Sequence, residues 1–94
     1  MSNNYYSQKY NKLINNYIIR APSKRKNKKY DVYDLQNHYL FSFGDSRFSQ
    51  FRDSLLYYKD RDNNDPKRRA LYYARHNKQY PDESPDTFSK VFLW

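Results

Sequence analysis

The sequence predicts a small α+β fold, in which a β-hairpin packs with two to three short helices and follows an extended basic N-terminal arm. Three observations lead to this prediction. Two β-type segments, 30–34 and 39–43, flank a connection of turn length. Two later segments begin with a helix-capping residue followed by proline, at Asp65-Pro66 and Ser84-Pro85. All of the excess positive charge lies in the first thirty residues.

The composition indicates one small domain with a core made largely of rings. The chain has 94 residues, of which 12 are Tyr and 6 are Phe, and aromatic residues make up 20% of the sequence. The absence of cysteine excludes disulfides and thiolate metal sites. No apolar run reaches the roughly 18 residues of a membrane span, and the N-terminus resembles no secretory signal. The lack of cysteine fits a reducing compartment, and no transmembrane segment is expected.

Charge divides the chain into an arm, residues 1–29, that is basic and rich in Tyr and Asn, and an aromatic-rich α+β domain, residues 30–94. Residues 1–30 contain eight Lys or Arg and no acid, whereas residues 31–94 contain ten of each kind. The net charge of +8 therefore comes entirely from the first third of the chain. Such an asymmetry favours an anionic partner for the arm.

An apolar patch within the arm has the spacing of one helix face. Its members are Leu13, Ile14, Tyr17 and Ile18. The patch is either an anchor for another protein or a packing surface against the chain's own domain. A third alternative, a membrane-surface helix, requires a longer apolar face.

A cationic run follows the break at Ala21-Pro22-Ser23. Each of its side chains could neutralise a phosphate without reading base sequence. An acidic protein surface and a solvated linker are the alternatives. The candidate anion- or nucleic-acid-binding residues are Lys24, Arg25, Lys26, Lys28 and Lys29 of the run, together with Arg68 and Arg69, whose alternative role is pairing with acids within the chain.

Within the hairpin, alternation places Tyr39, Phe41 and Phe43 on one face. Gly44 is the only glycine, and its position after the second strand predicts a backbone angle that other residues avoid.

Three helices are predicted after the hairpin. The first is capped by Asp45 or Ser46 and carries the core stripe Phe48, Phe51, Leu55 and Tyr58. The second runs from Pro66 to about Asn77, and the third carries Phe88, Val91 and Phe92. The terminal Trp94 is expected to be shielded against the core.

No catalytic motif is present, so we expect neither an enzyme nor a cofactor. His38 and His76 lie in a turn and at a helix end. The acids Asp60, Asp62 and Asp65 have a spacing loosely like that of an oxygen-ligand loop, but the bend glycine and the later Glu are missing. Pairing of these acids with nearby arginines is the stronger interpretation, and no metal site is predicted.

Residues 29–94 resemble a small uncharacterised protein family of nucleocytoplasmic large DNA viruses. The matching segments are Lys29-Tyr30-Asp31-Val32-Tyr33, Ser42-Phe43-Gly44-Asp45, Asp65-Pro66-Lys67-Arg68-Arg69, Tyr72-Tyr73-Ala74-Arg75-His76, Ser84-Pro85, Phe88-Ser89 and Leu93-Trp94. The chain departs from the family pattern at Asn37-His38, where a glycine is usual, and at Asn63 or Asn64, where a histidine is usual. The resemblance implies a viral context and no established activity.

Two functions follow as expectations. The first is a virion structural protein, a minor capsid or cementing component that binds neighbouring capsid proteins through its arm and aromatic surface. The second is a non-specific nucleic-acid-binding protein that uses the basic arm. The expected location is the virion or, otherwise, the interior of the infected cell.

Overall fold

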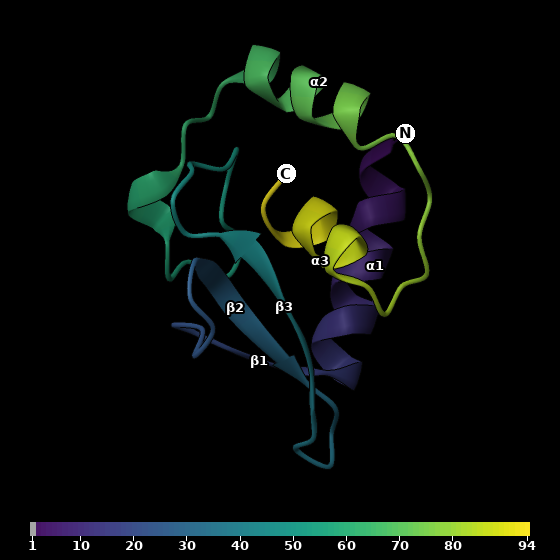
Figure 1. Cartoon of the computed structure of the whole chain (residues 1–94). Coiled ribbons are helices and arrows are strands. Elements are labelled where there is room, and N and C mark those ends of the chain that lie inside the picture. The colour runs from purple at the N-terminus through teal and green to yellow at the C-terminus, as the bar shows by residue number, and fades with distance from the viewer. Residues whose placement is uncertain (1) are drawn as a thin grey trace.

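A three-stranded antiparallel sheet is covered on one face by the first and last helices of the chain, whereas the middle helix lies beyond the end of the sheet (Figure 1). The computed structural model describes the backbone of residues 2–94 and the side-chain environments from residue 8 onward. The elements run in the order α1 (Ser2–Asn16), β1 (Ile18–Arg20), β2 (Lys28–Tyr33), β3 (Tyr39–Asp45), η1 (Lys59–Arg61), α2 (Pro66–Arg75) and α3 (Pro85–Phe92). Helix α3 packs on β3, and α1 packs on α3, which confirms the predicted α+β class.

The predicted hairpin is confirmed as β2 and β3. Tyr30 pairs with Phe43 and Val32 pairs with Phe41, and these side chains pack in or against the core. Gly44 has φ +78°, in the left-handed region that its position predicted.

The expectation of an extended arm is wrong, because residues before 30 supply a helix, a strand and part of the core. Ile19 of β1 pairs with Val32 of β2, and the Leu13 side chain is fully buried. The predicted boundary at residue 29 also falls inside β2. The cations of α1 pair with an acid from the loop before α3. Asp82 binds the Lys12 amino group at 2.8 Å and also pairs with Lys9.

The helix predicted after residue 45 is not formed, and the segment consists of turns followed by η1. Acidic side chains take the amide hydrogens that a helix would have used. The Asp53 carboxylate accepts from the amides of Leu55 and Tyr58 at 2.9 and 2.8 Å, and Asp62 accepts from the Asp53 amide at 2.7 Å. Leu56 adopts φ +76°, which ends any regular helix there.

The two capped helices are confirmed. Asp65 accepts a hydrogen bond from the Lys67 amide at 2.9 Å, and Ser84 accepts one from the Thr87 amide at 3.2 Å. Helix α2 ends at Arg75 with His76 as its C-cap, one residue before the predicted Asn77.

The core is built from rings, as the composition predicted. Phe88 of α3 contacts Phe41 and Phe43 with ring centroids 5.1 and 5.6 Å apart, and it packs edge-on to Tyr17. Trp94 is half-buried and stacks on Tyr72. Because this core occupies one face of the sheet, strand alternation turns the intervening residues to the opposite face, which we call the outer face.

Candidate nucleic-acid interface

The outer face brings together two tyrosines, three cations and one buried acid from β1, β2, β3 and the loop between β1 and β2. We call this cluster the outer-face site. Its members are Arg20, Lys24, Arg25, Asp31, Tyr33 and Tyr39.

An arginine guanidinium lies over each of the two tyrosine rings of the site. The guanidinium carbon of Arg20 lies 4.6 Å from the centre of the Tyr33 ring, and that of Arg25 lies 4.9 Å from the centre of the Tyr39 ring. Tyr33 and Tyr39 meet edge to face, with centroids 5.8 Å apart and 75° between their planes. Cations held over rings in this way combine phosphate-binding charge with flat surfaces on which bases can stack.

Asp31 holds the basic loop against the sheet. Its carboxylate accepts a hydrogen bond from the Lys24 amide at 2.8 Å, from the Ser42 hydroxyl at 2.6 Å and from the Ser23 hydroxyl. Burial alone would raise the pKa of Asp31, but these hydrogen bonds and the charge of Arg25 hold that pKa below its usual value. The ionised carboxylate therefore fixes Lys24 and Arg25 in place.

A shallow, open hollow of about 370 Å³, which we call the outer-face cavity, lies within the outer-face site. It is lined by Lys24, Arg25, Asp31, Tyr33 and Tyr39. Its volume falls in the range of small-molecule sites, roughly 300–1,000 Å³. The cavity can therefore accept a planar group of the size of a nucleobase.

Three predicted binding residues, Lys24, Arg25 and Lys26, are exposed. In the part of the chain that the structure describes, none of them forms an ion pair with an acid, whereas Arg47 binds Asp45 at 2.8 Å. These charges are available to an anionic partner.

Lys28 and Lys29 differ from each other. Lys28 is exposed and lines a different cavity. Lys29 is only 2% exposed, and its amino group donates to the Phe48 carbonyl at 2.9 Å and to Gln50. Burial, followed by the nearby charge of Arg61, lowers the pKa of Lys29 to about 8. The prediction that Lys29 contacts a partner is therefore wrong, because the segment after β3 covers its side chain and binds its amino group.

Arg68 and Arg69 bind groups of their own chain. Arg68 pairs with Asp65 at 3.8 Å. The Arg69 guanidinium donates to a Trp94 oxygen at 2.6 Å and lies 5.0 Å from the centre of the Phe51 ring. This arrangement matches the alternative role of pairing within the chain, and neither residue lines the outer-face cavity.

The predicted anchor patch is divided between core and surface. Leu13 is fully buried, Tyr17 and Ile18 are partly buried, and Ile14 is 38% exposed. The patch thus serves mainly to pack α1 and β1 on the domain, which was one of the two main alternatives.

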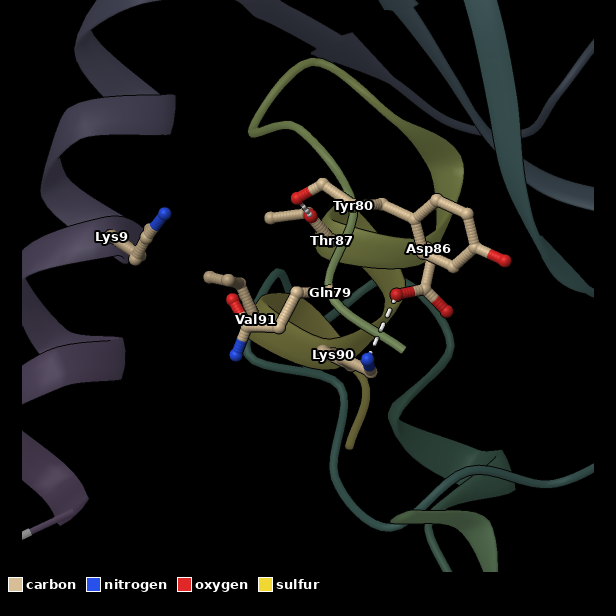
Figure 2. A pocket seen from close by; sticks show the side chains of 7 residues that line it. All are labelled: Lys9, Gln79, Tyr80, Asp86, Thr87, Lys90 and Val91. Atoms are coloured by element: carbon tan, nitrogen blue, oxygen red, sulfur yellow. Dashed lines mark hydrogen bonds and ion pairs between the residues drawn. The ribbon is translucent and has the colours of Figure 1, made fainter. Parts of the chain in front are cut away.

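Two other hollows are weaker candidates for a ligand site than the outer-face cavity. Figure 2 shows the smaller, where Asp86 and Lys90 of α3 form an ion pair at 2.9 Å. Its volume of about 30 Å³ suits a single water molecule. A larger hollow of about 430 Å³ lies between α2, α3 and the end of the hairpin, where its acids Asp45 and Asp86 are already paired with Arg47 and Lys90.

The described residues contain no cluster of three or more His, Cys, Asp or Glu that could hold a metal ion. None of the helices in the described range is long and apolar enough to cross a membrane.

Sequence reasoning found two of the three cations of the site, Lys24 and Arg25, but missed Arg20, Asp31, Tyr33 and Tyr39. Alternation placed Tyr39 with Phe41 and Phe43, but a register shift after Val32 pairs Tyr39 with Tyr33 instead. The signal that could have revealed the site was the tyrosine at the facing end of each hairpin strand, close in sequence to arginine and lysine.

No protein-family model matches the chain, and neither a curated protein nor a solved structure matches it. The resemblance to a viral family therefore stays a prediction.

Proposed function

We propose that the protein binds nucleic acid without sequence specificity through the outer-face site. The observation that carries this proposal is the placement of Arg20 and Arg25 over the rings of Tyr33 and Tyr39. Arginine beside exposed aromatic rings serves both parts of a nucleotide, because the cation attracts the phosphate and the ring stacks with the base.

The charge of the whole chain supports the proposal. The net charge is +8, and the exposed cations of the loop between β1 and β2 form no ion pair with an acid among the described residues. A localised positive charge attracts a polyanion and speeds its association. The interface differs from the one expected from the sequence in that the partner meets a folded sheet rather than an extended arm.

A capsid or cementing role stays a prediction. Its anchor residues Leu13, Tyr17 and Ile18 are at least partly engaged in the chain's own packing, so they offer little apolar surface to a capsid partner. The outer-face site therefore favours the nucleic-acid function as the first to test.

The proposal is tested by fluorescence anisotropy with a labelled single-stranded oligonucleotide of mixed sequence. The double variant Lys24→Gln/Arg25→Gln should bind more weakly. Each lost phosphate contact should flatten the slope of log affinity against log salt by about 0.7. The matched control Lys59→Gln/Lys67→Gln removes the same charge from exposed positions elsewhere and should bind almost as the parent protein does. Equal weakening in both variants, or no binding by the parent at low salt, would overturn the proposal.

A further inference from the structure

We infer that the outer-face site holds one unpaired base that carries an exocyclic amino group, from a single-stranded nucleic acid. This inference rests on the proposed function and specifies its ligand. Cytosine, adenine and guanine carry such an amino group, whereas thymine and uracil do not.

The two rings form a corner rather than a platform. Because the planes of Tyr33 and Tyr39 are 75° apart, successive bases in a parallel stack cannot each lie flat on one of them. A single base that enters the corner takes the place of the guanidinium over one ring, lying face-on to that ring and edge-on to the other, and both arrangements are favourable for aromatic groups. The cavity of about 370 Å³ provides room for one such base.

Asp31 lines the corner with a carboxylate that is only 2% exposed and whose Oδ2 accepts one hydrogen bond fewer than its Oδ1. A carboxylate offers about four lone-pair positions. Ser23 and Ser42 both donate to Oδ1, whereas the Lys24 amide alone donates to Oδ2. The remaining position on Oδ2 suits an amino group. A thymine or uracil carbonyl at the same place would direct its lone pairs at those of the carboxylate, and the two acceptors would repel each other.

The same carboxylate sets the direction of the nucleotide. A negative charge in the cavity wall repels a phosphate, while the exposed Lys24 and Arg25 attract one at the rim. The base therefore points inward and the phosphate outward. Within a duplex the amino edge is paired and both faces of the base are stacked, so only an unpaired base can enter.

Anisotropy with labelled oligocytidylate and oligothymidylate of equal length tests the inference at neutral pH. One good hydrogen-bonded contact to a base corresponds to a preference for cytosine of roughly tenfold. A duplex should bind more weakly than the cytosine strand, and the preference should be the same for ribose and deoxyribose strands because the site contacts the base. Equal affinity for both homopolymers, a duplex bound as well as the cytosine strand, or a preference confined to one sugar would overturn the inference.

Two variants of Tyr39 separate recognition from folding. Tyr39→Phe keeps the ring and should keep the cytosine preference, whereas Tyr39→Leu removes the ring and should abolish it. Thymine strands should still respond to Lys24→Gln/Arg25→Gln if the proposed function holds. Loss of that charge dependence in every strand would overturn the proposed function itself, whereas its persistence without a base preference would overturn only the present inference.

Discussion

Tyr72 and Trp94 stack face to face, with ring centroids 4.4 Å apart and 5° between their planes. The opposite side of Tyr72 is occupied by His76, whose ring lies 4.0 Å away. The Arg69 guanidinium adds a hydrogen bond of 2.6 Å to a Trp94 oxygen. These contacts fasten α2 to the residues that follow α3, although α2 and α3 are separated by a loop of nine residues, 76–84.

Replacing Trp94 by Ala should therefore lower the free energy of unfolding by about 2 kcal/mol, somewhat less than the 3–5 kcal/mol of a fully buried ring, because Trp94 is only half-buried. Urea unfolding followed by circular dichroism measures this loss. Leu71→Ala is the control, since Leu71 lies on the same helix but is 58% exposed. A loss no larger in the Trp94 variant than in the control would show that the stack does not support the fold.

Gly44 should tolerate no side chain. A Cβ atom at this position would lie 2.9 Å from Leu93 Cδ1 and 3.1 Å from Lys29 Cβ, and φ is +78°. Both the close approach and the left-handed angle penalise Ala, so Gly44→Ala should lower the free energy of unfolding by about 2 kcal/mol. Thermal and urea denaturation provide the measurement.

Asn37 offers the matched comparison for Gly44. Its φ is 70°, but it lies exposed in the connection between β2 and β3. Asn37→Gly relieves the left-handed angle without removing a core contact, so the stability should change by less than about 1 kcal/mol. A Gly44→Ala protein as stable as the parent would contradict the steric argument.

Because of Lys29, the free energy of unfolding should increase with pH in the mildly alkaline range. Its folded-state pKa is lowered to about 8 from the usual 10.5. Between these values the unfolded chain binds more protons than the folded chain, so raising the pH favours the folded state, by at most about 1.4 kcal/mol per pH unit. Above about pH 10 the sign reverses, because burial raises the pKa of Tyr17 to about 12 and that of Tyr30 further, and the unfolded chain then loses its tyrosine protons first.

Urea unfolding measured at intervals from pH 8 to pH 10 tests this expectation. Lys29→Met removes the titrating group and should flatten the rise in unfolding free energy. Lys28→Met changes the exposed neighbour and should leave the rise in place. A parent protein whose stability is constant or falls across this range would show that Lys29 titrates normally.

Local signals in the sequence predicted the hairpin and the two proline-capped helices well. Asp65 and Ser84 act within three residues of the amides that they cap, and a pattern of that length can be recognised directly. The helix predicted for residues 48–58 is wrong, and of its predicted core stripe Leu55 and Tyr58 pack against the core whereas Phe48 is 63% exposed. There, Asp53 and Asp62 bind backbone amides and compete with the helix, which an apolar pattern does not register.

Long-range pairing explains what the sequence could not reveal about the arm and the site. Lys12 finds its acid at Asp82, so the absence of acids near the arm suggested an extended segment where a docked helix exists. The cations Lys24 and Arg25 were predicted as binding residues, but their relation to Tyr33 and Tyr39 depends on a register shift in the hairpin. Such a shift follows from the packing of both strands and leaves no local signature.

Variants of the neighbouring residues Leu13 and Ile14 test whether the N-terminal segment is a docked helix or an extended arm. Leu13 is fully buried in the core, whereas Ile14 is 38% exposed. Leu13→Ala should lower the free energy of unfolding by about 2–5 kcal/mol through the cavity that it leaves. Ile14→Ala should cost less, about 1 kcal/mol, since 38% of the surface of Ile14 stays in contact with water.

Urea unfolding and trypsin digestion of the full chain measure both variants. Detachment of α1 breaks the pairs of Lys9 and Lys12 with Asp82 and frees the helix backbone, so the Leu13 variant should be cleaved faster at these lysines than the parent. The Ile14 variant should be cleaved at the parent rate, because it keeps the same core contacts. If both variants unfold and digest as the parent does, the N-terminal helix contributes nothing to the domain, and the arm behaves as an independent segment.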